Sequence, residues 1–104
     1  MDAKKLLDAG NELLSDRVRL AIMATLAAAD EPVEFKVLLE TLGLTKGNLS
    51  SHVSRLEEAA LVEVKKEFVG KRPRTSYACT PAGREAIIGY LKQVEEMLKG
   101  AVKS

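Results

Sequence analysis

Residues 44–80, LTKGNLSSHVSRLEEAALVEVKKEFVGKRPRTSYACT, decide the fold of this 104-residue chain. Apolar residues at steps of four, three and four predict a helix over 46–60 with one buried stripe: Leu49, Val53, Leu56 and Ala60. Alternating apolar and charged residues predict a strand over 61–69. Glycine and proline within 70–74 predict the tip of a hairpin, and a second strand returns over 75–80.

The face of this helix opposite the apolar stripe is small and polar. Glycine, asparagine and serine each cost a helix up to about 1 kcal/mol relative to alanine, whereas an ordinary solvated face is rich in Lys and Glu. Their clustering predicts a surface that closely approaches another surface; the alternative is a polar face that meets only water. The residues of this face are Gly47, Asn48, Ser51, Ser54, Arg55 and Glu58, with Lys46 near the helix start and Ser50 on the flank.

The segments before this stretch predict two further helices and a helix-turn-helix. We expect a short helix over 3–14, with Leu6, Leu7, Leu13 and Leu14 on one side, and a second helix to about Ala29, capped by Ser15 or Asp16. Residues 33–35 fit a brief strand or the lead-in to a helix over 36–42, in which Val37, Leu38 and Leu42 are expected to face the core. Gly43 fits the C-terminal cap of that helix and Thr45 the N-terminal cap of the next, which is the helix-turn-helix pattern.

The segment after the hairpin predicts a long terminal helix. Thr80 and Pro81 fit its N-cap and first helical position, and it is expected to continue to about Lys99. Ile87, Leu91, Val94 and Leu98 follow coiled-coil spacing. This stripe continues too far for the amino-terminal helix alone to cover it, which predicts a homodimer. The expected interface residues are Leu6, Leu7, Ile87, Tyr90, Leu91, Val94, Met97 and Leu98.

Composition and the absence of certain motifs exclude several classes of protein. Hydrophobic residues make up 46% and charged residues 30%, which suits one globular domain over residues 1–104. The single Cys79 excludes an intramolecular disulfide and a multi-cysteine zinc site. No apolar run approaches the ~20 residues of a membrane helix, and the first residues do not resemble a signal peptide, so we expect a cytoplasmic protein. No phosphate-binding glycine loop, zinc-hydrolase motif or nucleophile–base–acid set is evident, so we expect neither an enzyme nor a bound cofactor or metal.

Positive charge is concentrated around the hairpin. The net charge is +1, but residues 46–75 hold seven cations and four acids, which is +3 and leaves −2 for the rest of the chain. Lys65 and Lys66 are weaker candidates for binding, because Glu63 and Glu67 dilute them. A small polar helix followed by a basic hairpin is typical of a winged helix-turn-helix, in which the helix enters the major groove and the hairpin contacts the flanking backbone. The expected DNA contacts are Lys46, Asn48, Ser50, Ser51, Ser54, Arg55, Lys71, Arg72 and Arg74.

Three further side chains allow two interpretations each. Arg19 fits a phosphate contact or an ordinary surface position with equal weight. His52 is expected to pack or form a hydrogen bond at the edge of the buried stripe rather than meet DNA. Cys79 shares its strand face with Tyr77 and is expected to pack in the interior rather than sense redox state.

The chain resembles small prokaryotic winged-helix transcriptional regulators related to the MarR and ArsR families. The resemblance covers about residues 15–100 and rests on RVRLAI at 17–22, LGLTKGNLSSHVSRLEEAALVEV at 42–64, FVGKRPRTSY at 68–77 and TPAGR at 80–84. It implies sequence-specific binding to operator DNA by a homodimer whose terminal helices form the interface. Ala60 departs from the glycine of many relatives, and no metal constellation of the ArsR kind is present.

The predicted fold is mainly α with a small β-hairpin, a winged helix-turn-helix with flanking N- and C-terminal helices. Its core is expected at residues 15–80 and its dimerisation helix at 81–100. A winged-helix adaptor that binds proteins instead of DNA remains the alternative, and a repressor that senses a small molecule would need a cavity. The sequence does not identify an effector.

Overall fold

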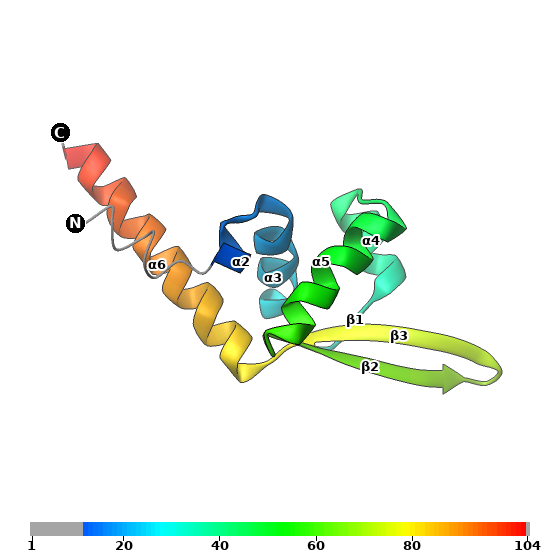
Figure 1. Ribbon diagram of the computed structural model, residues 1–104. Coiled ribbons are helices and arrows are strands. Elements are labelled where there is room, and N and C mark those ends of the chain that lie inside the picture. Colours follow the sequence, from blue (N-terminus) through cyan, green and yellow to red (C-terminus); the bar gives the residue numbers. More distant parts are fainter. Residues whose placement is uncertain (1–11, 104) are drawn as a thin grey trace.

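The computed structural model describes residues 12–103 and confirms the predicted winged helix (Figure 1). Its elements, labelled as in Figure 1, are α2 (Glu12–Ser15), α3 (Arg17–Ala28), β1 (Val33–Glu34), α4 (Phe35–Leu42), α5 (Lys46–Glu58), β2 (Val62–Val69), β3 (Arg72–Cys79) and α6 (Pro81–Lys103). The predicted helix over 3–14 lies largely outside the described residues, as do Leu6 and Leu7. Within residues 12–103, no helix combines the length and hydropathy needed to cross a bilayer.

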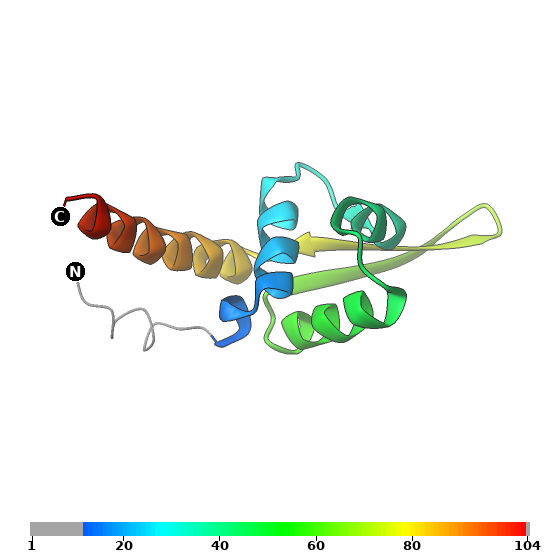
Figure 2. The ribbon, with the colours of Figure 1, turned by 90° about the horizontal axis from the view of Figure 1, so that it is seen from above.

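The sheet has three antiparallel strands in the order β1-β3-β2. β1 pairs with β3 at only two positions, Val33 with Tyr77 and Glu34 with Ser76, so most of β3 toward the hairpin end has a free edge. β2 and β3 pair along their full length, from Val62 opposite Cys79 to Val69 opposite Arg72. The hairpin therefore extends as a two-stranded ribbon beyond the rest of the sheet (Figures 1 and 2).

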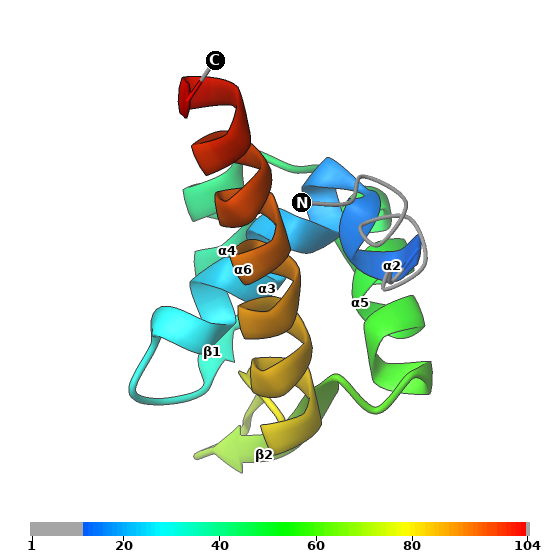
Figure 3. The ribbon, with the colours of Figure 1, turned by 90° about the vertical axis from the view of Figure 1, so that its left-hand side faces the viewer.

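A single apolar core joins the three central helices, the base of the sheet and the start of α6. Ile22 and Met23 of α3 and Leu38 of α4 are fully buried, as are Leu49 and Leu56 of α5. Viewed along the long axis, α6 passes in front of α3 (Figure 3). The core therefore fixes α5 against α3. The face of α5 that points away from the core remains exposed. The other core members are Leu14, Leu26, Val53, Leu61, Val62, Tyr77 and Ile87.

The hairpin tip is shorter than predicted. The sequence pattern places the tip at 70–74, but the connection consists only of Gly70 and Lys71, and Arg72 already belongs to β3. Gly70 has φ 66°, the left-handed conformation that glycine adopts without steric penalty. Pro73 joins the strand opposite Phe68, where β3 has a free outer edge, and proline is tolerated at sheet edges because it has no N–H to donate.

Three other expectations need correction. Val37 does not face the core: it is 45% exposed, and Phe35, Leu38, Leu39 and Leu42 form the packed face of α4 instead. The helix predicted to reach Ala60 ends at Glu58, because Ala60 has φ 61° and cannot continue a right-handed helix. The terminal helix, by contrast, is longer than expected and ends at Lys103.

The sequence TPAGR at 80–84 joins three elements at the base of α6. The Thr80 hydroxyl donates to the Ala60 carbonyl at 2.7 Å and accepts the N–H of Gly83 at 2.9 Å. The Arg84 guanidinium donates to the Ala27 carbonyl in the last turn of α3, at 2.9 Å. A cation at this position stabilises the C-terminal end of a helix. This short sequence thus sets the position of α6 relative to α3 and to the end of α5.

Candidate nucleic-acid interface

The exposed face of α5 carries the side chains that the sequence predicts for DNA contact. Lys46, Asn48 and Ser50 are exposed, and so are Ser51, Ser54 and Arg55. Thr45 caps the helix by accepting the N–H of Asn48 at 3.1 Å, which leaves the Asn48 side chain free of this role. The stripe of Leu49, Val53 and Leu56 anchors the helix from the opposite side. The structure therefore brings these six candidates together on one continuous, outward-facing helix.

The hairpin lies beyond the N-terminal end of α5, and both project toward the same end of the molecule (Figures 1 and 2). Lys71 and Arg72 are exposed at the turn. No ion pair within residues 12–103 involves either side chain. These two cations can therefore interact with phosphate without first breaking an intramolecular contact.

Arg74 differs from its two neighbours because it already has acidic partners. Its Nε atom lies 3.3 Å from Glu34 Oε1 and 3.7 Å from Glu67 Oε1, and Glu67 also lies 3.8 Å from Lys65 Nζ. The Arg74 side chain is 42% exposed, so these pairs are screened by water and contribute little stability. They nevertheless offset its charge, so Arg74 is a weaker candidate for phosphate binding than the sequence alone suggests.

A shallow groove of about 680 Å³ lies between the hairpin and the start of α4. Cations dominate its lining: Lys36 from α4, Lys66 from β2, and Arg72 and Arg74 from β3, against the single acid Glu34. Sequence reasoning did not find Lys36, because this residue belongs to another helix and only the fold brings it to the hairpin. The groove extends the basic character of the hairpin toward the helix-turn-helix.

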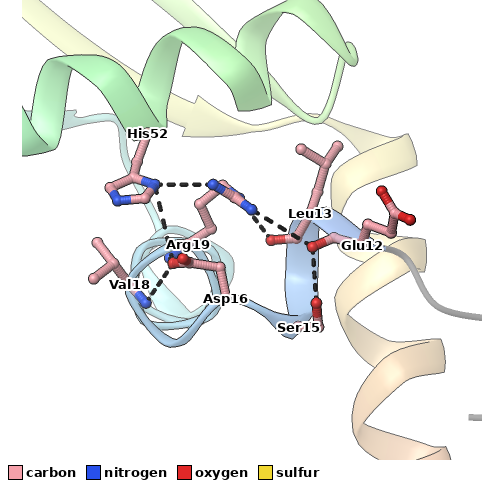
Figure 4. Close-up of polar contacts among 7 residues, drawn as sticks. All are labelled: Glu12, Leu13, Ser15, Asp16, Val18, Arg19 and His52. Atoms are coloured by element: carbon pink, nitrogen blue, oxygen red, sulfur yellow. Dashed lines mark hydrogen bonds and ion pairs between the residues drawn. The ribbon is translucent and has the colours of Figure 1, made fainter. Parts of the chain in front are cut away.

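A hydrogen-bond network fixes α5 to the helices that precede it (Figure 4). Arg19, which is 7% exposed, donates from Nε to the Leu13 carbonyl at 2.8 Å and from Nη1 to His52 Nδ1 at 3.1 Å. Its Nη2 reaches the Glu12 carbonyl at 3.5 Å. Because a guanidinium can only donate, His52 Nδ1 is the acceptor in this hydrogen bond. The hydrogen-bonding role expected of His52 is confirmed, whereas both interpretations of Arg19 are wrong: it is a buried link between α2 and α5.

Asp16 belongs to the same network. Its Oδ1 atom caps α3 by accepting the N–H groups of Val18 at 2.9 Å and Arg19 at 3.0 Å, and it lies 3.9 Å from His52 Nδ1. The hydrogen bond from the Arg19 backbone holds the pKa of Asp16 below its ordinary value, with the nearby Arg19 charge acting in the same direction and desolvation against it. The capping role expected for Ser15 or Asp16 thus belongs to Asp16.

Cys79 is half-buried, and its thiol lies 3.4 Å from the Thr80 carbonyl. Burial raises the pKa of this thiol above its ordinary value, and the charge of Arg84 opposes the effect only in part. This environment agrees with the expected packing role, because a raised pKa disfavours the reactive thiolate. Among residues 12–103, no group of three or more His, Cys, Asp or Glu side chains could hold a metal ion.

The predicted dimer residues of α6 occupy different environments. Ile87 is 2% exposed and belongs to the core of its own subunit, so it is not available to a partner, and Tyr90 packs partly against that core. Leu91, Val94 and Leu98 are 45%, 40% and 61% exposed, and Met97 is half-buried. Sequence reasoning missed Val102, which is 75% exposed and extends the same stripe by one turn.

Sequence reasoning also missed two apolar residues of the hairpin. Phe68 is 74% exposed and Val69 is 53% exposed, although both lie in a strand whose base is buried. The signal was present in the sequence, since FV directly precedes the glycine of the turn. The alternation of residues in a strand does not show how far along the hairpin the core extends, so that pattern alone does not predict that Phe68 and Val69 are exposed.

The chain is similar to a known protein family, to a relative in another organism and to solved structures. Residues 18–98 match the family described as winged helix DNA-binding domain. An uncharacterized protein from Methanocaldococcus jannaschii is 36% identical over 88 residues, which span 85% of this chain and 95% of that protein. A transcriptional regulator homologue from Pyrococcus horikoshii has the same fold with a TM-score of 0.84 and 32% identity, covering 94% of each chain.

More distant structures share the fold alone. A putative MarR-family regulator from Enterococcus faecalis aligns with a TM-score of 0.74 and 20% identity, covering 99% of this chain and 91% of that one. Staphylococcus aureus MepR, in a structure of its DNA complex, aligns with a TM-score of 0.64 and 16% identity, over 97% of this chain and 90% of that one. The solved structures named here are described as transcriptional regulators or a homologue of one, not as enzymes.

Proposed function

The chain belongs to the winged helix DNA-binding domain family, and on that premise we propose that it is a sequence-specific, double-stranded-DNA-binding transcriptional regulator that acts as a homodimer on promoter or operator DNA in the cytoplasm. Its fold is that of MarR-type winged-helix regulators. One observation carries the proposal: α5, whose exposed face is small and polar, and the hairpin, whose turn carries cations without an ion pair among residues 12–103, project toward the same end of the molecule (Figures 1 and 2).

The chemistry of α5 suits the reading of base edges. Asn48 can form a bidentate hydrogen bond with adenine and Arg55 with guanine, while Ser51 and Ser54 can donate to several acceptors. Gly47 and the serines have small side chains, so the backbone of α5 can approach the floor of the major groove closely. Lys46 near the helix start can meet a flanking phosphate.

The second half of α6 supports the homodimer. The apolar stripe of this helix begins at Ile87, which the core covers, and continues through Leu91, Val94, Leu98 and Val102, which remain exposed. Large apolar patches are uncommon on the surface of monomers. A two-fold axis through these helices would present two copies of α5 to successive major grooves, about 34–36 Å apart, and favour a palindromic site.

Selection of bound duplexes from a randomised pool tests this function directly. We expect an enriched motif with two-fold symmetry. Replacing Asn48 or Arg55 with alanine is expected to relax the preference at defined positions, at a cost of roughly 1–3 kcal/mol for each base that is no longer read. Glu63→Ala, on an exposed strand position outside the proposed interface, serves as the control and should leave the motif unchanged.

The adaptor alternative predicts a different result. A protein-binding winged helix would enrich no motif and would show no preference to relax. If the pool yields no enriched sequence with a correctly folded chain, the proposed regulator is wrong and the adaptor is favoured.

A further inference from the structure

The distal part of the hairpin exposes an aromatic side chain that the fold does not use. Phe68 of β2 is 74% exposed and stands directly opposite Pro73 of β3, so the two side chains lie on one face of the ribbon. The chain has only four aromatic residues. Of the other three, Tyr77 is buried, and Phe35 and Tyr90 pack against the core. Phe68 therefore adds little to the stability of the isolated subunit.

Cations surround this apolar pair. Lys66 lies two residues before Phe68 on the same strand, Lys71 is in the turn, and Arg72 follows it at the start of β3. All three are exposed, and none takes part in an ion pair within residues 12–103. The hairpin end thus combines a projecting apolar side chain with unneutralised positive charge.

We propose that Phe68 and Pro73 form an apolar wedge that enters the minor groove of the DNA beside the site read by α5. This inference rests on the proposed function, and it adds a contact that is neither a phosphate nor a base-edge hydrogen bond. The minor groove offers a suitable surface, because its walls are apolar deoxyribose and its rims are phosphates. Apolar side chains, phenylalanine and proline among them, are inserted into minor grooves, where they partly unstack a base step.

The hairpin is rigid enough for this role. β2 and β3 pair without interruption to Val69 and Arg72, and a two-residue turn with Gly70 at φ 66° closes the ribbon. Pro73 has a fixed φ, which reduces the freedom of the strand opposite Phe68. Little conformational entropy is therefore lost when the wedge inserts. The cations then hold the rims of the same groove, since Lys71 and Arg72 lie at the adjoining turn.

The test distinguishes the contribution of the apolar Phe68 side chain to DNA affinity from the contribution of the hairpin cations. Affinity for the selected duplex is measured over a series of salt concentrations for wild type, Phe68→Ala, Phe68→Leu and Arg72→Ala. Phe68→Ala is expected to bind about tenfold more weakly at every salt concentration, as removal of a partly buried aromatic ring would produce. Its slope of log K against log salt should equal that of wild type, whereas Arg72→Ala should lower the slope by up to about 0.9. Phe68→Leu should recover most of the affinity.

A fluorescent base analogue, 2-aminopurine, placed in turn at each step flanking the α5 motif gives a second readout. Wild type is expected to raise its fluorescence at one step by unstacking, and Phe68→Ala is expected to abolish that rise. Val69→Ala is the matched control, because Val69 is the neighbouring exposed apolar residue on the other face of the ribbon. It should retain both the affinity and the fluorescence signal.

Any of three results would overturn the wedge: Phe68→Ala binding as tightly as wild type, Val69→Ala weakening the affinity as much as Phe68→Ala, or a changed salt slope for Phe68→Ala. A Phe68→Ala variant with normal DNA affinity but altered subunit mass in light scattering would assign the patch to a protein contact instead. If wild type binds no duplex at all, the proposed function fails together with the wedge; failure of the wedge alone leaves wild-type binding intact.

Discussion

Arg19 shows how a single buried side chain can position a surface that it does not touch. Its guanidinium donates to the Glu12 and Leu13 carbonyls of α2 on one side and to His52 of α5 on the other (Figure 4). The Glu12 carbonyl also accepts the Ser15 hydroxyl at 2.9 Å, and each guanidinium nitrogen of Arg19 has an acceptor, so this charged side chain is buried with its donors paired. The orientation of α5 thus depends on an interior arginine as well as on apolar packing.

Asp16, which caps α3 beside this network, makes a pH-dependent contribution to stability. Its pKa is lowered in the folded chain, chiefly by the hydrogen bond from the Arg19 backbone. The stabilisation is therefore fully present above the unfolded pKa of about 3.9, and is lost as the pH falls through the lower folded pKa. We expect Asp16→Ala to reduce the free energy of unfolding by about 1 kcal/mol at pH 7. The deficit should shrink at pH 3, measured by urea unfolding at fixed protein concentration.

Asp16→Asn is the matched control for that measurement. Asparagine keeps a capping oxygen but carries no charge, so its stability relative to Asp16→Ala should be the same at both pH values. An Asp16→Ala deficit as large at pH 3 as at pH 7 would show that the ionised carboxylate contributes nothing.

The end of α5 is an element whose geometry conflicts with its sequence. The N–H of Leu61 donates to the Leu56 carbonyl at 3.0 Å and that of Ala60 to the Glu57 carbonyl at 2.9 Å. This is the Schellman pattern, in which the left-handed position is normally glycine. Ala60 occupies it with φ 61° and is the one non-glycine residue within 12–103 with a positive φ. The helix is therefore closed by hydrogen bonds that work against a steric penalty on alanine.

Ala60→Gly is expected to stabilise the protein for that reason. Removing the Cβ relieves roughly 1–2 kcal/mol of left-handed strain. The greater freedom of glycine in the unfolded chain offsets part of this gain, which leaves a net increase of about 0.5–1 kcal/mol. Thermal unfolding at fixed concentration would measure the change. A lower melting temperature would mean that Ala60 is not strained.

At Gly83, near the start of α6, glycine is required by close packing, and we expect replacement by alanine to destabilise the protein. A Cβ there would overlap the Leu61 carbonyl oxygen and lie 2.9 Å from Met23 Cε, whereas one on Gly89 would meet nothing within 4 Å. Gly83→Ala should therefore cost about 1–3 kcal/mol by overpacking. Gly89→Ala should stabilise the same helix by up to about 1 kcal/mol, since alanine is the better helix former. Equal effects of the two substitutions in urea unfolding would contradict this close packing.

Local sequence signals predicted the elements well and their ends less well. The stripe of α5 and the alternation of β2 follow from periodicity, which depends only on neighbouring residues. The short hairpin tip and the exposure of Val37 depend on where other elements stop, in particular on β1 ending opposite Ser76. The roles of Arg19 and Lys36 arise from contacts between residues distant in sequence, and no local pattern contains them.

At the scale of the whole molecule, the two proposed interaction surfaces lie at opposite ends. The chain measures 58 × 24 × 24 Å, with the hairpin projecting from one side of the helical body and α6 from the other (Figures 1 and 2). At 1.5 Å per residue, the 23 residues of α6 extend about 34 Å, and only Gly83 and Ile87 of these are buried. A second subunit on α6 would therefore leave both hairpins free.

We expect light scattering to give twice the chain mass at low micromolar concentration. Leu91→Glu combined with Leu98→Glu should yield a folded monomer that binds DNA more weakly, because a charge on each exposed apolar position opposes burial. Lys92→Glu with Lys99→Glu, on exposed positions of the same helix, is the control and should remain a dimer. A wild-type monomer that binds its site tightly as a single subunit would exclude the dimer.

The salt dependence of DNA affinity tests the joint role of α5 and the hairpin most directly. For wild type and the selected duplex, log K should fall steeply and linearly with log salt. Lys71→Ala with Arg72→Ala should flatten the slope by up to about 0.9 for each phosphate that is no longer neutralised. Arg74→Ala should change it less, because Glu34 and Glu67 already offset that charge. Affinity that does not respond to salt, or a slope that the double substitution leaves unchanged in a folded protein, would contradict a DNA-binding surface built from these two elements.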